Sequence, residues 1–186
     1  MRWSIRERDD QGEVIGTAYR APDGSKSFEP GGKRGLIVDW PLPVYAGSSM
    51  DDPVFVCEGA SDTAALMSVG LDAVGVPMAG QGGKLLAGVL NARHAVIVAD
   101  NDDAGRRGAH KLSAALLGSC ASVRVMPPPL GAKDAREAVL AGATGAGFKD
   151  EASGFLSFPV EPRGVPGKER KDSPGFEWVS LADIGP

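Results

Sequence analysis

The feature that most constrains the fold is a regular alternation of apolar runs and helical segments between residues 54 and 142. The mostly apolar runs are 54–57 (VFVC), 72–77 (DAVGVP), 95–99 (AVIVA) and 122–127 (SVRVMP). Runs of this kind are typical of strands that are buried on both faces. Segments with helical character follow them, at 61–70, 83–92, 104–118 and 133–142. Four strand–helix repeats predict an α/β fold with a sheet of about four parallel strands and flanking helices.

The chain before this region has a different pattern, which predicts a small β-rich subdomain over residues 1–50. Turn signals at 10–12 (DQG) and 22–24 (PDG) separate short stretches that are rich in Ile, Val, Tyr and Phe. Such turns between short β-prone stretches are typical of hairpins. A Pro/Gly/Ser-rich connection follows at 41–53. We therefore expect a boundary near residue 50 and a second domain over residues 51–144.

The chain after this domain loses the alternation. Glycine and proline recur to about residue 175, together with charged stretches such as GKERKDSPG. We interpret 145–186 as a linker or tail for that reason.

Composition excludes several classes of protein. A net charge of −4 argues against binding nucleic acid by bulk charge alone, although a local basic patch is compatible with it. No apolar run approaches the roughly 18 residues of a membrane span, and the N-terminus lacks a signal-peptide core. We interpret Cys57 and Cys120, which lie in or beside apolar runs, as reduced core thiols. We expect a cytoplasmic protein with no membrane partner, and no zinc in this chain.

Acidic residues follow two of the predicted strands at the point where each strand ends. Glu58 and Gly59 follow the first apolar run, and Asp100 and Asp102 follow the third. Ligands of open α/β sheets bind at the carboxyl ends of the strands. If the two strands are neighbours, three carboxylates converge there, a set of oxygen ligands suited to Mg²⁺ or Mn²⁺.

Other interpretations of the same residues can be tested against the sequence. A calcium-binding EF-hand loop from Asp100 would need acids where Ala104 and Lys111 stand. The segment 80–86 (GQGGKLL) lacks residues that a Walker A loop requires. A plain helix N-cap explains one acid before a helix, but two acidic strand ends together favour a metal site.

A Glu-Gly pair after one buried strand, followed about forty residues later by DxDxxG, resembles the Toprim domain. Toprim domains occur in bacterial-type primases, type IA and II topoisomerases, OLD-family nucleases and RecR-like repair proteins. The resemblance covers about residues 52–142. It implies that Glu58 is a general acid/base that shares the metal, and that Asp100 and Asp102 bind Mg²⁺ or Mn²⁺. Gly59 and Gly105 would support these residues by allowing tight turns.

Further residues resemble the primase subgroup of phages and plasmids. Asp62, in EGASD, stands where primase-like members often keep an acid, and an Arg follows DxDxAG in DNDDAGRRGA. The segment PPPLGAKDAREAVLAG is similar to a GKDxND stretch, with Lys133 and Asp134 matching; the resemblance implies that Asp134 completes the metal cluster. We interpret Asp103 as a helix cap or a minor metal ligand.

The segment from residue 12 to residue 36 looks like the small domain that precedes Toprim in those primases. In them it supplies basic residues to the template or the nucleotide, and the matching positions are Arg20, Lys26, Lys33 and Arg34. Lys84, Arg106 and Arg107 are further candidates for contacts with phosphate. Ordinary surface charge is the alternative for each of these basic residues.

The resemblance implies a metal-dependent primase-type nucleotidyltransferase of a phage or plasmid. Its partners would be a single-stranded DNA template, ribonucleoside triphosphates and a replicative helicase on the same or another chain. No zinc module is expected here, and the ending FEWVSLADIGP resembles the lead-in to a helicase or ATPase domain; we therefore expect part of a larger or split replication protein. A Toprim nuclease and a non-catalytic module that binds DNA or a partner protein remain the alternatives.

Overall fold

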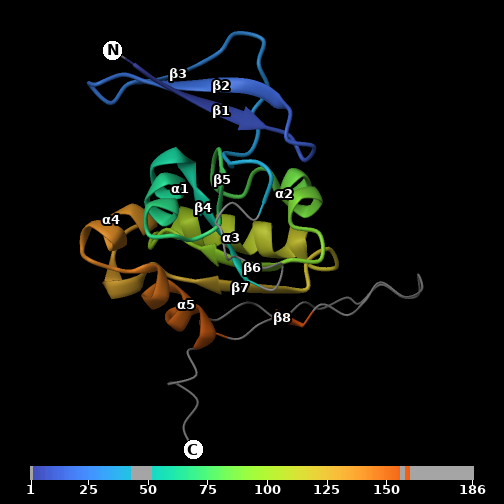
Figure 1. Cartoon of the computed structure of the whole chain (residues 1–186), viewed down its shortest axis with the longest axis vertical. Helices are drawn as coiled ribbons and strands as arrows, with labels where there is room; N and C mark the ends of the chain where they lie inside the picture. The colour runs from blue at the N-terminus through green and yellow to red at the C-terminus, as the bar shows by residue number, and fades with distance from the viewer. Residues whose placement is uncertain (1, 43–51, 156–157, 160–186) are drawn as a thin grey trace, which may run out of the picture.

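Two sheets form the framework of the chain, and Figure 1 shows the smaller one above the larger one. The computed structural model describes residues 2–42, 52–155 and 158–159. The small sheet is antiparallel and has the order β1-β2-β3, with β1 at Trp3–Arg8, β2 at Val14–Arg20 and β3 at Lys26–Phe28. It confirms the β-rich N-terminal subdomain.

The large sheet has the strand order β5-β4-β6-β7-β8. Its four parallel strands are β4 (Val54–Glu58), β5 (Ala73–Val76), β6 (His94–Val98) and β7 (Ser122–Met126). The short β8 (Phe158–Pro159) pairs antiparallel with β7. The predicted sheet of about four parallel strands is therefore confirmed.

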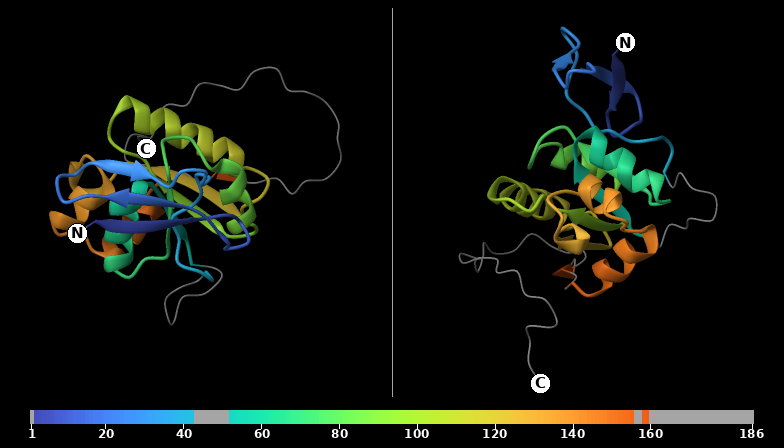
Figure 2. Two further views of the ribbon diagram at one scale, coloured as in Figure 1. Left: turned by 90° about the horizontal axis from the view of Figure 1, so that it is seen from above. Right: turned by 90° about the vertical axis from the view of Figure 1, so that its left-hand side faces the viewer.

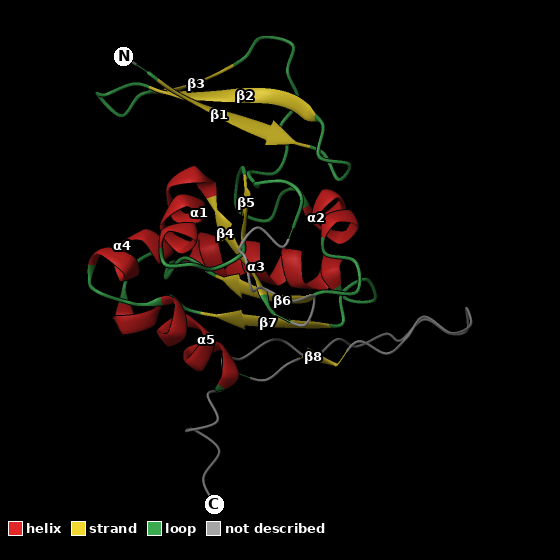
Figure 3. Cartoon of the chain, viewed as in Figure 1, coloured by secondary structure: helices red, strands yellow, loops and turns green. Residues whose placement is uncertain are grey.

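Helices cover both faces of the large sheet, as Figures 2 and 3 show. They are α1 (Gly59–Ser68), α2 (Gly83–Val89), α3 (Asp103–Leu116), α4 (Ala135–Leu140), α5 (Gly145–Ser153) and a 3₁₀ turn at Pro129–Gly131. Side chains alternate between the two faces of a strand. Val56 of β4 accordingly packs in the core under α2 and α3, while Phe55 packs in the core under α1, α4 and α5.

Glycine turns and one backbone bridge fix the small sheet in place. Gly12 and Gly24 close its two hairpins with φ of +85° and +84°, which confirms the turn signals in the sequence. The chain then crosses to the large sheet, where the backbones of Ile37 and Gly75 exchange hydrogen bonds of 2.8 and 2.7 Å. Leu36, fully buried in the core beside this bridge, ties the small sheet to the edge strand β5.

The prediction that a linker begins at residue 145 is wrong for residues 145–153. This segment forms α5, which is capped by Thr144: its hydroxyl accepts a hydrogen bond of 3.1 Å from the Gly147 amide. Phe148 and Ala152 lie one helical turn apart and are both buried. In the sequence, the glycines and charged residues around Phe148 and Ala152 made the helical spacing of these two residues hard to recognise. Residues 156–157 and 160–186, including the FEWVSLADIGP ending, lie outside the described residues.

Two smaller expectations can also be compared with the structure. Cys57 and Cys120 are free and buried, which confirms their interpretation as core thiols. Among the described residues, no helix is both long enough and apolar enough to span a membrane.

The position of Phe148 predicts that α5 is part of the folded core. Its ring is fully buried and meets Phe55 edge to face, with ring centroids 6.1 Å apart. Phe148→Ala should therefore lower the free energy of unfolding by about 3–5 kcal/mol, measured by urea titration. Leu140→Ala, at a side chain that is 74% exposed, is the control and should change it by less than about 0.5 kcal/mol. Equal effects of the two variants would contradict this packing.

Candidate functional site

A cleft of about 1020 Å³ lies between the small sheet and the carboxyl ends of the parallel strands. One wall comes from β1, β2, β3 and the loop after β3, and includes Trp3, Ile5, Glu7, Ala18, Arg20, Lys26, Phe28 and Arg34. The other wall comes from the large sheet and its helices, and includes Glu58, Gly59, Asp62, Met78, Asp100 and Arg136. The cleft therefore brings predicted basic residues of one domain opposite predicted acidic residues of the other.

The register of the large sheet explains why the acids meet. β4 and β6 are direct parallel neighbours, with Val54 beside Ala95 and Val56 beside Ile97. Glu58 ends β4, and Asp100 follows β6 by two residues. The two carboxylates thus reach the same rim of the sheet, as the sequence predicted for neighbouring strands.

Two glycines allow the backbone to turn at this rim. Gly59 directly follows Glu58 and has φ of +78°, a conformation that L side chains rarely adopt. Gly105, in the first turn of α3, lies so close to Asp100 that a Cβ at this position would collide with the Asp100 carbonyl oxygen. Gly59 thus allows the turn after β4, whereas Gly105 allows α3 to pack closely against Asp100.

Burial and mutual repulsion raise the pKa of the carboxyl groups in the cleft. The pKa of Asp100 is raised to about 7, first by burial and then by the charges of Asp62, Glu58, Asp134 and Asp102. Burial also raises the pKa of Glu58, and the Asp102 and Asp62 charges add to the effect. None of the ion pairs among the described residues includes these groups.

Asp102 differs from its neighbours because it caps α3. Its side chain accepts a hydrogen bond of 2.8 Å from the Gly105 amide, and this bond lowers its pKa. Asp103 instead forms an ion pair of 2.5 Å with Arg106. The interpretation of Asp103 as the helix cap is therefore wrong, because the cap lies one residue earlier.

The segment around Asp134 is held against the acidic rim. Asp62 accepts a hydrogen bond of 2.9 Å from the Arg136 amide, which links α1 to the start of α4. Asp134 caps α4 by accepting a bond of 2.8 Å from the Glu137 amide. The Lys133 carbonyl accepts a bond of 2.8 Å from the Asn101 amide. The matched Lys-Asp pair thus lies beside the loop that carries Asp100 and Asp102.

Of the four predicted basic residues that come from the small sheet and the loop after it, three line the cleft. Arg20 and Lys26 line the cleft, and the charge of Lys26 lowers the pKa of Glu58. Arg34 also lines the cleft, but its guanidinium is paired with the fully buried Glu7 through contacts of 2.9 to 3.1 Å. Lys33 is not among the cleft residues, although it comes from the same loop. Arg34 therefore anchors that loop to β1, a structural role.

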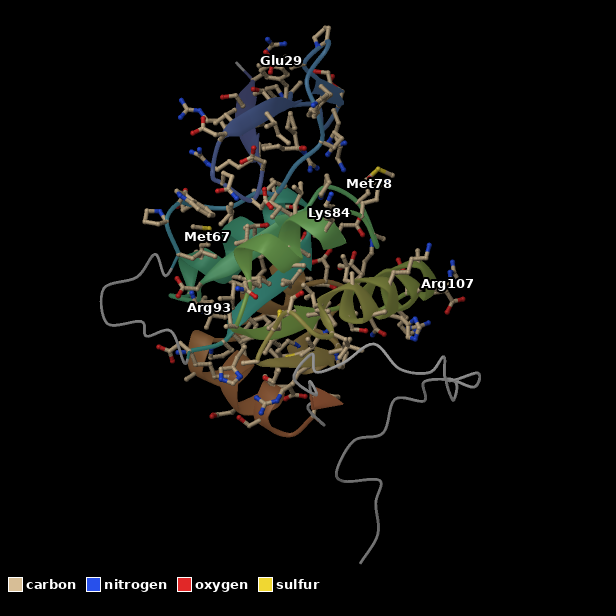
Figure 4. The ribbon with its side chains drawn as sticks, turned by 90° about the vertical axis from the view of Figure 1, so that its right-hand side faces the viewer. Glu29, Met67, Met78, Lys84, Arg93 and Arg107 are labelled. Carbon is tan, nitrogen blue, oxygen red and sulfur yellow. The ribbon has the colours of Figure 1, made fainter. Side chains whose placement is uncertain are left out.

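Three more basic candidates lie outside the cleft lining. Figure 4 shows Lys84 on α2 and Arg107 on the exposed side of α3. Arg106 contacts Asn101 and Asp103 on its own helix and the loop before it. The prediction that these residues contact phosphate receives no support from the cleft geometry.

The donor chemistry of the rim suits a divalent cation. Several carboxylates repel one another there, and an ion would relieve that repulsion. Oxygen ligands of this type are those that Mg²⁺ and Mn²⁺ prefer. Within the described ranges, no three acidic, Cys or His side chains already surround a common point. The rim residues therefore fit a metal by their chemistry and position.

Trp3 and Arg136 are two of the cleft residues that sequence reasoning did not predict. Trp3 projects from β1 on the same side as Ile5 and Glu7, and the strand alternation of the first residues was the signal for it. Arg136 replaces an expected Asn of the family pattern, and its amide holds Asp62. Only the contact between α1 and α4 shows its importance.

The Glu7–Arg34 pair gives a prediction about stability. Arg34→Ala would leave the Glu7 carboxylate buried without its cation, so the free energy of unfolding should fall by about 3 kcal/mol. Lys33→Ala, one residue earlier at an exposed position, should leave it nearly unchanged. Urea titration of both variants measures the difference. A stable Arg34→Ala protein would show that the pair does not hold the loop.

The repulsion at the rim gives a prediction about charge and pH. The pKa of Asp100 in the folded protein is raised from 3.8 to about 7, so its charge destabilises the fold most above about pH 7. This cost falls as the pH is lowered from about 7 to about 4, because the folded state takes up the proton before the unfolded state does. In chelator at about pH 8, Asp100→Asn should therefore raise Tm, by about 2–4 °C for each kcal/mol relieved. This advantage over the unsubstituted protein should shrink as the pH is lowered. Asp150→Asn, at an exposed carboxylate on α5, should not raise Tm at either pH.

Comparisons with known proteins agree with this geometry. Residues 55–139 match the sequence model of a family described as Toprim-like. A search among curated proteins found no significant match. Among solved structures, the primase fragment of the bacteriophage T7 primase-helicase is 20% identical, with a TM-score of 0.53; the match covers 81% of this chain and 62% of that one.

Two bacterial-type primases are also similar. The DnaG primase catalytic domain bound to single-stranded DNA is 20% identical with a TM-score of 0.63, over 84% of this chain and 52% of that one. The Aquifex aeolicus primase, with its zinc-binding and RNA polymerase domains, is 22% identical with a TM-score of 0.63, over 84% of this chain and 41% of that one. The chain thus spans about 41% to 62% of the length of these structures. Residues 55–139 of this protein match the Toprim-like family model, and together with the sheet before them they have the fold of these primase catalytic domains.

Proposed function

We propose that the chain is the catalytic part of a primase-type nucleotidyltransferase, which joins ribonucleotides on a single-stranded DNA template. One observation carries this proposal. The cleft sets Arg20 and Lys26 of the small sheet opposite Glu58, Asp62 and Asp100 of the Toprim domain. Such a cleft offers cations for phosphate groups on one wall and ligands for a divalent cation on the other.

The acidic wall would hold the metal. Asp100 and Asp102 are the principal ligands in this proposal, with Glu58 and Asp134 contributing from β4 and from the start of α4. When bound, Mg²⁺ or Mn²⁺ would neutralise negative charge on the phosphate oxygens of the nucleotide and help to orient them. The capping bond of Asp102 fixes its carboxylate beside α3, so this ligand is oriented before any ion arrives.

Glu58 has the properties of a residue that transfers protons. Burial and neighbouring charges raise its pKa, which brings a carboxyl group closer to the operating pH of a general acid or base. Its place at the rim, beside Asp100 and facing Lys26, would let it accept a proton from an attacking hydroxyl. Sharing the metal with the aspartates is its second role in this proposal.

The basic wall would bind the substrates. Arg20 and Lys26 lie in the cleft and are exposed, so they are available for phosphate groups of the template or of the triphosphate. This local patch agrees with a net charge of −4 for the whole chain, because charge in a cleft acts on what enters it. The DnaG catalytic domain that shares this fold was solved bound to single-stranded DNA, which supports such a template here.

The remaining assignments belong to the same proposal. The small domain over 1–50 and the Toprim domain from 51 would form one catalytic unit, extended to α5 rather than ending at residue 144. A replicative helicase is a proposed partner, since a similar fold occurs in the phage T7 primase-helicase.

The test is synthesis of short RNA by the full chain. The reaction contains single-stranded DNA, labelled ribonucleoside triphosphates and Mg²⁺ or Mn²⁺, and products are separated on a gel. Asp100→Asn and Glu58→Gln should each lower synthesis by about 100-fold or more, as loss of a catalytic group usually does. Asp102→Asn should do so too while keeping α3 intact, because Asn also caps helices well.

The controls separate the proposal from its alternatives. Asp150→Asn should leave synthesis unchanged. Cleavage of the DNA in metal alone, without synthesis, would identify a nuclease. DNA binding that none of the acidic substitutions affects, again without synthesis even when candidate partner chains are added, would contradict catalysis and favour a binding module.

A further inference from the structure

One row of side chains crosses all three strands of the small sheet on the side that faces the cleft. The register places Trp3 beside Arg20, and Arg20 beside Lys26. All three residues line the cleft. Because neighbouring strands lie about 4.8 Å apart, the row is about 10 Å long. An aromatic side chain and two cations are thus aligned on one wall of the proposed catalytic site.

Trp3 is an aromatic residue of this sheet whose ring is open to the cleft. Tyr19 is covered by the Arg2 guanidinium, 3.9 Å from its ring centroid, and Phe28 by the Arg34 guanidinium, 4.9 Å from its centroid. Within the described part of the chain, no ring or guanidinium stacks on Trp3, which is 57% exposed. Exposure of so large an apolar surface costs free energy until a partner covers it.

We propose that Trp3, Arg20 and Lys26 form a nucleotide-binding subsite. The indole of Trp3 stacks on a nucleobase, and the two cations contact the phosphate next to it. Every nucleobase has a flat π face, so this subsite accepts any base. The inference rests on the proposed function and deepens it, because it names the residue that holds the base.

The chemistry of the row favours a nucleotide. Arg20 and Lys26 supply the positive charge that a phosphate needs. Both lie on the same side of the indole, on β2 and β3. The opposite wall carries Glu58 and Asp100. A base held on Trp3 would therefore lie in the same cleft as the acidic rim, with its phosphate on the basic side.

Binding assays on the full chain test the subsite without any catalysis. Fluorescence anisotropy in chelator would measure binding of labelled oligo-dT and of an abasic strand of the same length, and competition by ATP would measure free nucleotide. Trp3→Leu should weaken binding of oligo-dT, of ATP or of both by about 5- to 150-fold, the effect expected for loss of one stacked base. The abasic strand should bind the variant and the unsubstituted protein equally. Comparing the effects of Trp3→Leu on oligo-dT and on ATP shows whether the base that stacks on Trp3 comes from the DNA strand or from the free nucleotide.

Two variants control for effects on the fold. Trp3→Phe keeps an aromatic face and should restore most of the binding. Trp40→Leu removes another exposed tryptophan, which is 42% exposed, lies against Gly12 and does not line the cleft; it should bind like the unsubstituted protein. Circular dichroism should show the same fold for all of them.

The outcomes separate this inference from the proposed function. If the unsubstituted chain binds oligo-dT or ATP and Trp3→Leu binds them equally well, the subsite is wrong while the proposed function stands. An equal loss of abasic-strand binding in Trp3→Leu would also overturn it, because stacking cannot act on a strand without bases. If the unsubstituted chain binds neither ligand, both proposals fail.

Discussion

The parallel pairing of β4 with β6 is the constraint on which the rest of the site depends. It places Glu58 and Asp100 at one rim of the sheet, at the cost of repulsion that raises the pKa of both. A protein that only needed to fold would gain by replacing one of them with a neutral residue. A bound cation would relieve this repulsion and so explain why both acidic residues are present. That explanation is the basis of the proposed function.

The surrounding structure holds this repulsion in place. Gly105 brings α3 against Asp100, and Asp102 accepts the bond that caps the same helix. Asp62 uses its carboxylate to hold the start of α4, so a buried charge also has a structural partner. The acidic rim is therefore part of the packing of three helices, and substitutions there change stability as well as chemistry.

The second wall of the cleft depends on a different kind of interaction. The bridge between Ile37 and Gly75 attaches the small sheet to β5, and Glu7 with Arg34 fixes the loop leading to it. Only this attachment turns an acidic rim into a cleft with opposite charges on its two sides. This attachment also places Arg20, Lys26 and Trp3 in the cleft. The proposed binding of template and nucleotide therefore depends on it.

Local patterns in the sequence determined the strands, the order of strand and helix, the hairpin turns and the acids at the two strand ends, because each depends on neighbouring residues. The tertiary structure alone decided that β4 lies beside β6, that Phe148 of α5 reaches Phe55, and that Arg34 pairs with Glu7. It also decided which basic residues face the acids: Arg20 and Lys26 do, whereas Lys84 and Arg107 do not. The physical reason is that charge, burial and stacking act between side chains far apart in the chain, and only the folded backbone sets their distances.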